Sequence, residues 1–194
     1  LDSLYSRWLG VPNSKKMTSV KPSGTVSLLC GATPGIHFPH SEFYLRRVRV
    51  ANTSPLVEAA RKAGYPVEQD TYADDTAVVS FPVKEKHFVK GKREVSIWEQ
   101  FTLAAAMQAQ WADNQVSVTV SFAQSEAKDI ATCLATFDDQ LKSISMLPLS
   151  EHGYVQAPYE SITEAEYNQL AARITMLDLS GQDAHDIDAE DKFC

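Results

Sequence analysis

Cysteine is scarce in this sequence, whose 194 residues contain only Cys30, Cys133 and Cys194. Three scattered thiols cannot make a disulfide framework, so a reducing compartment, the cytoplasm, is the expected location. Long apolar runs are missing as well, and none approaches the length that crosses a bilayer. The opening residues, LDSLYSRWLG, lack the basic and then apolar pattern of a secretory signal. These absences predict a protein without a membrane partner.

Positive charge is also in short supply. The chain has 18 Lys and Arg against 25 Asp and Glu, which gives a formal net charge of −7. This balance argues against a broad positively charged surface that could bind a nucleic-acid backbone, so we expect no nucleic-acid partner. Apolar residues make up 44% and charged residues 22% of the chain, which is ordinary for a globular protein with one core or two small ones.

Both ends of the sequence are unusual. Residue 1 is Leu, and the last residue, Cys194, follows an acidic stretch. A natural domain can have such ends, but a piece cut from a longer chain has them more readily. Residues 180–194 have little apolar content and many acids, so we expect them to form a flexible tail.

Strands and helices alternate along most of the chain. Apolar alternation predicts a short β run at 17–21 and strands at 43–51, 76–84 and 116–122. Capping residues predict four helices, which begin after Ser54, Ser96, Ser125 and Thr163. The helix after Ser96 is apolar nearly all round, which predicts deep burial, and the helix after Ser125 should end before Pro148. This order predicts an α/β fold with partly parallel strands.

The stretch SVKPSGTVSLLCG, residues 19–31, is a candidate anion site. Pro22 ends the β run, and Gly24 would let a ligand approach the main chain closely. A helix that begins near Thr25 would direct its positive end to the same place, where Ser23 and Thr25 add hydroxyl donors. A phosphate group suits these donors. Small polar residues are also common at ordinary helix starts, and spacing alone favours that simpler interpretation.

Two other polar clusters are weaker candidates. His37 and His40 could bind a metal, but two histidines do not complete a site, and the favoured interpretation is loop histidines without a special role. The strand at 43–51 carries three arginines, which could bind an anion, although a solvated or ion-paired strand face is favoured. These residues are Arg46, Arg47 and Arg49.

The cysteines and tryptophans differ in what they suggest. Cys30 and Cys133 lie in apolar surroundings and are expected to be buried. Cys194 lies in the polar tail, where its thiol would be exposed and reactive. The alternative interpretation is that Cys194 is an accidental truncation point and that its thiol has no function. Three aromatic residues on and after the second helix are expected in the core: Trp98, Phe101 and Trp111.

Three motifs carry a resemblance to a known family. TSVKPSGTVSLLCGATPGIHFPHSEFYLRRVRV resembles the ribonucleotide reductases, specifically the adenosylcobalamin-dependent (class II) branch of the monomeric ribonucleoside-triphosphate reductase type. WADNQVSVTVSF and LKSISMLPLSEHGYVQAPYESITEAEY are similar to later parts of the same family. The most specific part is the Lys-Pro-Ser-Gly-Thr loop followed by Pro-Gly-Ile-His.

The resemblance implies a fold and a division of the chain. The family's core is a ten-stranded α/β barrel, and a finger loop inside the barrel carries the radical cysteine. Residues 1–179 would then be the C-terminal portion of the barrel domain, and residues 180–194 a flexible acidic redox tail. A half barrel would expose strand edges, which predicts either a compact rearrangement or self-association through those edges.

The resemblance also implies a site and an activity. By position, Pro22, Ser23, Gly24 and Thr25 would bind the phosphates of the substrate, which reverses the preference for a plain helix start. The parent enzyme would convert ribonucleotides to deoxyribonucleotides by thiyl radical chemistry, with adenosylcobalamin as cofactor and a thioredoxin-like reductant as partner.

Two departures from the family limit this chain. The radical cysteine of the family lies in an Asn-x-Cys-x-Glu segment, which this sequence lacks. Cys194 matches the first of two tail cysteines, and a lone thiol cannot complete dithiol exchange. We therefore expect a C-terminal fragment that supplies the phosphate loop and is inactive alone. The alternative is a stand-alone phosphate- or nucleotide-binding module, or a subunit that docks on a separately encoded N-terminal half.

Overall fold

The computed structural model describes residues 1–23, 27, 31–149 and 155–180, which fall into two compact units. Unit 1 comprises Leu1–Pro39 and Lys90–Leu149, and unit 2 comprises His40–Val89 and Ser150–Cys194. Each unit therefore combines two separate stretches of sequence. Over the described residues, no helix is both long and apolar enough to cross a bilayer.

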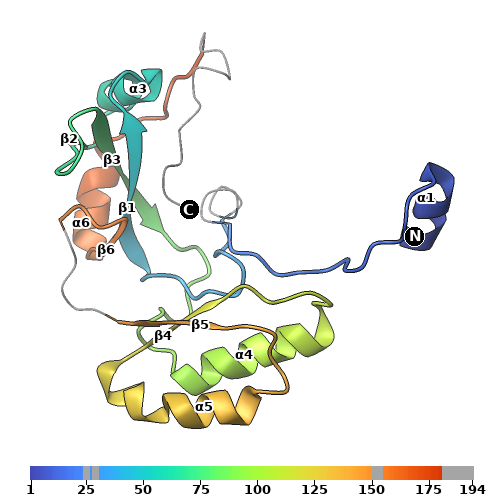
Figure 1. Ribbon diagram of the computed structural model, residues 1–194. Coiled ribbons are helices and arrows are strands. Elements are labelled where there is room, and N and C mark those ends of the chain that lie inside the picture. Colours follow the sequence, from blue (N-terminus) through green and yellow to red (C-terminus); the bar gives the residue numbers. More distant parts are fainter. Residues whose placement is uncertain (24–26, 28–30, 150–154, 181–194) are drawn as a thin grey trace. The chain divides into compact units, whose positions relative to one another are not determined.

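Unit 1 is a parallel strand pair covered by helices. Strand β4 pairs with β5 in parallel, and Val20 forms a parallel bridge with Val116 on the approach to β4. Helices α4 and α5 lie side by side against this pair (Figure 1). The elements of the unit are α1 (Asp2–Leu9), α4 (Ile97–Gln110), β4 (Thr119–Phe122), the 3-10 helix η1 (Gln124–Asp129), α5 (Ile130–Phe137) and β5 (Ser145–Pro148).

The core of unit 1 follows the predicted alternation along residues 116–122. Every second side chain is buried there: Val116, Val118, Val120 and Phe122. On the helices that cover them, Ile97, Phe101 and Cys133 are fully buried. Parallel pairing and covering helices confirm the α/β class for this part of the chain.

Unit 2 contains a four-stranded antiparallel sheet with strand order β2-β3-β1-β6. The long strands β1 and β3 pair along their whole length, from Phe43 opposite Lys84 to Ala51 opposite Thr76. Val57 and Ala60 of α3 pack on Val50 and Val79 of the sheet. The elements are β1 (Phe43–Ala51), α3 (Pro55–Lys62), β2 (Val67–Gln69), β3 (Thr76–Lys84), β6 (Tyr159–Ser161) and α6 (Glu164–Ala171).

Three of the predicted helix starts are confirmed by their hydrogen bonds. The hydroxyl of Ser54 accepts from the backbone N–H of Leu56, and the hydroxyl of Ser96 accepts from that of Glu99. At α6, the hydroxyl of Thr163 accepts from the N–H of Glu166, whose carboxylate accepts in return from the N–H of Thr163. Each cap satisfies a backbone donor that the first helical turn leaves unpaired.

The predicted helix from Ser125 to Pro148 is wrong in its extent. Over this span the chain forms η1 and then α5, which ends at Phe137. The last part of the predicted span is the strand β5. Ser145–Pro148 takes strand form because it pairs with Thr119–Phe122, while Met146 packs on the core beneath. The helical part, η1 and α5 together, therefore covers only about half of the predicted span.

The predicted deep burial of α4 is also wrong within unit 1. One face of the helix is buried, with Gln100 and Phe101 among its residues, and the other is exposed. Phe101 is a core residue as expected, but Trp98 is 37% and Trp111 59% exposed. An alanine-rich helix can thus present an apolar outer face that composition alone does not distinguish from a buried one.

Candidate phosphate-binding site

The segment that leads into the candidate loop is fixed to unit 1 by Asp113. Its carboxylate accepts from the backbone N–H of Met17 at 2.9 Å and from that of Thr18 at 2.9 Å. The hydroxyl of Thr18 donates to the carbonyl oxygen of Trp111 at 2.7 Å. The two backbone hydrogen bonds, from Met17 and then from Thr18, hold the pKa of the Asp113 carboxyl below its ordinary value. The start of the predicted β run is therefore anchored by a charged side chain.

Beyond this anchor, the chain runs parallel to the approach to β4. Val20 bridges to Val116, and its carbonyl oxygen accepts from the N–H of Ser117 at 2.9 Å. The ammonium group of Lys21 then lies 3.4 Å from the hydroxyl of Ser117. The β run predicted at 17–21 is therefore reduced to an isolated bridge at Val20, because only this residue pairs with the approach to β4. Lys21 and Pro22 follow the bridge on its carboxyl side.

The candidate loop itself is described only in part. Pro22 is exposed and Ser23 is half-buried, and the carbonyl oxygen of Ser23 accepts a hydrogen bond from the hydroxyl of Ser27. Gly24 and Thr25, the other two predicted phosphate-binding residues, lie outside the described residues. So do Cys30 and Cys194. Phosphate binding by this loop remains a prediction.

A second turn lies directly against the loop. Gly35 has a φ of 57°, and a Cβ atom added to it would lie 3.3 Å from the backbone nitrogen of Pro22. The N–H of His37 donates to the carbonyl oxygen of Pro34 at 3.0 Å, which closes the turn. Sequence reasoning recognised this stretch only as a punctuated loop; the Pro-Gly dipeptide was the available signal for a positive φ.

The imidazole of His37 connects that turn to β4. Its Nε2 accepts from the backbone N–H of Thr119 at 3.0 Å, and its Nδ1 lies 2.9 Å from the carbonyl oxygen of Pro34. His37 is a loop residue, as predicted, and both of its ring nitrogens lie within hydrogen-bonding distance of backbone groups. Among the described residues, no group of three His, Cys, Asp or Glu side chains is arranged to hold a metal ion.

Two of the three arginines on β1 are ion-paired, in agreement with the predicted solvated or ion-paired strand face. Arg49 contacts Asp70 at 2.6 Å, and Arg47 pairs with Glu160 at 2.5 Å. The guanidinium of Arg46 lies 4.7 Å from the ring centroid of Tyr159. These contacts hold β6 and the residues before it on the sheet of unit 2.

Cys133 is fully buried, and burial raises the pKa of its thiol. A buried thiol that resists ionisation is a poor nucleophile. The prediction of an inert structural cysteine at this position is therefore confirmed.

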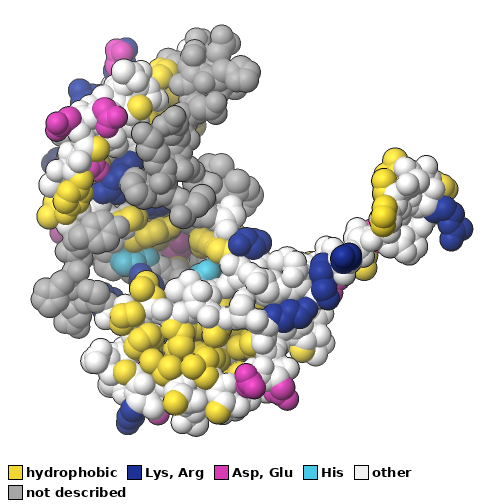
Figure 2. Space-filling model, in the orientation of Figure 1, with side chains coloured by type: hydrophobic (Ala, Val, Ile, Leu, Met, Phe, Trp, Pro, Cys, Tyr) yellow, Lys and Arg dark blue, Asp and Glu magenta, His cyan; other side chains and the backbone are white. Residues whose placement is uncertain are grey.

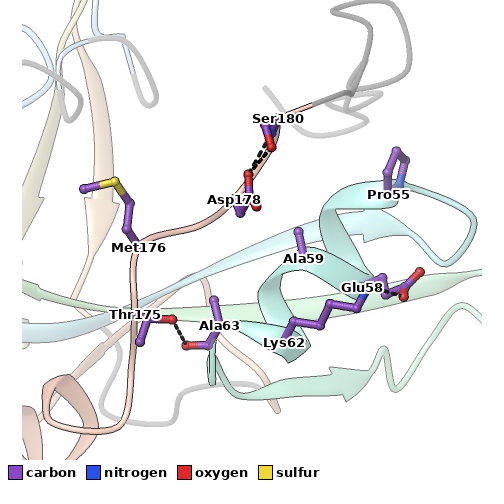
Figure 3. Close-up of a pocket in the computed structure, with 9 residues that line it drawn as sticks. All are labelled: Pro55, Glu58, Ala59, Lys62, Ala63, Thr175, Met176, Asp178 and Ser180. Atoms are coloured by element: carbon purple, nitrogen blue, oxygen red, sulfur yellow. Dashed lines mark hydrogen bonds and ion pairs between the residues drawn. The ribbon is translucent and has the colours of Figure 1, made fainter.

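Unit 2 contains a pocket of about 370 Å³ between α3 and the segment that follows α6. Figure 3 shows that polar groups of its lining pair with one another. Glu58 pairs with Lys62 at 2.7 Å, and Asp178 accepts from the hydroxyl of Ser180 at 2.6 Å. The lining has no imidazole or thiol that could bind cobalt. No residue of this pocket is therefore assigned to the cofactor.

Comparison with known proteins gives a consistent result. No protein-family model matches the chain. The chain is 43% identical over its full length to 26% of a probable adenosylcobalamin-dependent ribonucleoside-triphosphate reductase of Dictyostelium discoideum. Over 89% of its length it is 47% identical to 24% of the adenosylcobalamin-dependent ribonucleoside-triphosphate reductase of Euglena gracilis. The similarity is thus nearly complete for this chain and partial for its relatives.

A solved structure supports the same relationship. A crystal structure of a B12-dependent (class II) ribonucleotide reductase matches 90% of this chain and 25% of its own, with a TM-score of 0.80 and 38% identity. The chain spans about a quarter of the length of the curated relatives it matches. It is therefore homologous to about a quarter of an adenosylcobalamin-dependent ribonucleotide reductase.

Proposed function

We propose that this chain is the C-terminal part of an adenosylcobalamin-dependent ribonucleotide reductase and supplies the loop that binds the substrate's phosphates. The observation that supports this most is the position of Lys21 and Pro22, which follow a parallel bridge on its carboxyl side. Residues 22–25 would present backbone N–H groups and the hydroxyls of Ser23 and Thr25 to the phosphates. The substrate is a ribonucleoside phosphate.

The proposal is tested by titrating the chain with a ribonucleoside triphosphate before and after Ser23→Ala and Thr25→Val. Each change removes one hydroxyl donor, so affinity should fall by about threefold to tenfold, the effect of one hydrogen bond. Ser125→Ala and Thr102→Val are matched controls, because both residues are exposed and lie on other elements. Unchanged affinity in the Ser23 and Thr25 variants would refute the phosphate role.

The chain alone is expected to be inactive as a reductase. Its sequence has no Asn-x-Cys-x-Glu segment to carry the hydrogen-abstracting thiol, and Cys133 is buried. Adenosylcobalamin would supply the radical in the parent enzyme. Turnover by this chain with adenosylcobalamin and a dithiol would contradict the expectation.

Exposed apolar side chains favour a role as part of a larger assembly. In α1 and just after it, Trp8 is 69% and Leu9 is 74% exposed, and Met17 is 68% exposed. Figure 2 shows hydrophobic side chains gathered on α1 and over the layer of α4 and α5. Such surface is costly to leave in water. The rest of the reductase, in the same polypeptide or separately encoded, would cover it.

The remaining assignments belong to the same proposal. Residues 1–179 would form the C-terminal portion of a ten-stranded barrel, and residues 180–194 its redox tail, with Cys194 as one tail thiol. A thioredoxin-like protein would reduce the parent enzyme, which would act in the cytoplasm. A nucleotide-binding module that works alone is the alternative, and it would bind nucleotide without any second half.

A further inference from the structure

His37 has a hydrogen-bonding arrangement that selects one tautomer of its neutral imidazole. The backbone N–H of Thr119 can only donate, so Nε2 of His37 must accept, at 3.0 Å. The proton of the neutral ring then lies on Nδ1, where it donates to the carbonyl oxygen of Pro34 at 2.9 Å. Thr119 and His37 are 82 positions apart in the sequence, so this imidazole joins two distant segments.

The contacts around His37 form a closed series of links beside the candidate loop. From Thr119 the links pass through His37 to the turn at Pro34 and Gly35. Gly35 lies so near the backbone of Pro22 that an added Cβ atom would be 3.3 Å from the nitrogen of Pro22. From Pro22 the chain leads back to Val20, which pairs with Val116 and Ser117 on the way to Thr119. Every link is a backbone contact or hydrogen bond within unit 1, apart from the imidazole of His37. The side chain of His37 is therefore the one link that a substitution can remove cleanly.

We propose that His37 is a positioning residue for the phosphate loop: as a neutral imidazole with its proton on Nδ1, it holds the Pro34–His37 turn against Pro22. This inference rests on the proposed function of the loop. The loss of either hydrogen bond would let the turn move away from the loop backbone. The ligand would then have to bring the turn and Pro22 back together, and the free energy of that rearrangement would be subtracted from binding.

The first test reads the imidazole directly and needs no nucleotide. Long-range proton–nitrogen NMR spectra of the chain at neutral pH should show the proton of His37 on Nδ1 and a bare Nε2. The exposed His87, which serves as an internal reference, should show the ordinary mixture of tautomers. A His37 with its proton on Nε2, or with the same mixture as His87, would overturn the inference.

The second test measures the affinity for a ribonucleoside triphosphate in variants of His37. His37→Ala removes both hydrogen bonds and should weaken binding about tenfold. His37→Gln places an amide oxygen near the position of Nε2 and should recover part of that loss, whereas His87→Ala should bind as the unaltered chain does. If His37→Ala does not fold, the comparison of His37→Gln with the unaltered chain and the NMR spectrum still decide the question.

The outcomes separate this inference from the function on which it rests. If Ser23→Ala and Thr25→Val weaken binding but His37→Ala does not, the loop binds phosphate and the positioning role of His37 is refuted. If His37→Ala weakens binding and His37→Gln does not restore it, a general structural defect explains the loss and the inference also fails. If neither loop variant changes the affinity, the proposed function fails first.

Discussion

Gly64 and Arg173 lie so close together that no side chain fits between them. A Cβ atom added to Gly64 would lie 3.3 Å from the carbonyl carbon of Arg173 and would overlap its oxygen. The next residue but one, Thr175, donates its backbone N–H to the carbonyl oxygen of Ala63 at 2.9 Å. The end of α3 and the segment after α6 are therefore joined backbone to backbone.

Gly64→Ala should destabilise unit 2 strongly. The substitution combines a φ of 84° with a backbone overlap, and together these should cost about 2–4 kcal/mol in the free energy of unfolding. Gly10→Ala is the matched control, since Gly10 has a φ of 64° but open space around it and should cost only about 1 kcal/mol. Urea unfolding followed by fluorescence would compare them, and equal losses would show that the overlap does not matter.

Asp113 should make the anchoring of residues 17–18 dependent on pH. Its pKa is lowered in the folded chain by the N–H groups of Met17 and Thr18, so the carboxylate form is the one that stabilises. This stabilisation is complete above the ordinary carboxyl pKa of about 4 and is lost as the pH falls through the lower folded value. NMR signals of the Met17 and Thr18 amides should titrate in that acidic range. They should not titrate there in Asp113→Asn, and persistence of the titration would assign it to another group.

The buried ion pair of unit 2 should matter far more than the exposed one. Asp70 is 3% exposed and contacts Arg49, whose side chain is 20% exposed, whereas Glu58 and Lys62 are both largely exposed. Asp70→Asn leaves a guanidinium with no carboxylate and should cost about 2–4 kcal/mol, somewhat less than a fully buried pair. Glu58→Gln should change the free energy of unfolding by less than about 0.5 kcal/mol. Similar losses in the two variants would contradict the role assigned to Asp70.

The pKa of Asp70 gives this pair a pH dependence of known sign. Burial raises the pKa of its carboxyl, but hydrogen bonds from the N–H of Tyr72 and from Arg49 outweigh burial and lower it. The contribution to stability is therefore present at neutral pH and is lost as the pH falls below the ordinary carboxyl range.

Short-range features of the fold could be predicted from sequence, and pairings between distant segments could not. The caps at Ser54, Ser96 and Thr163 depend on residues two or three positions away, which a local pattern contains. Strand β5 was predicted as helix because its reason to be a strand is β4, some 26 positions earlier. The three-residue strands β2 and β6 were missed because they are too short to show alternation.

The candidate site shows the same division. The Pro-Ser-Gly-Thr loop was recognisable from its residues, since glycine and hydroxyl side chains at a strand end suit an anion. His37 was not, because a lone histidine between prolines gives no sign of a contact with Thr119. Trp111 was expected in the core because it is a large aromatic residue, but its exposed fraction is 59%.

The most direct test of the account compares the affinities of this chain for a ribonucleoside triphosphate and for the same nucleoside without phosphates, by calorimetric titration. If the loop at residues 22–25 binds the anionic end of the nucleotide, the triphosphate should bind and the bare nucleoside should bind at least tenfold more weakly, the loss expected for about 1.4 kcal/mol of phosphate contacts. Equal affinity for the two, or no binding of the triphosphate, would contradict the central claim.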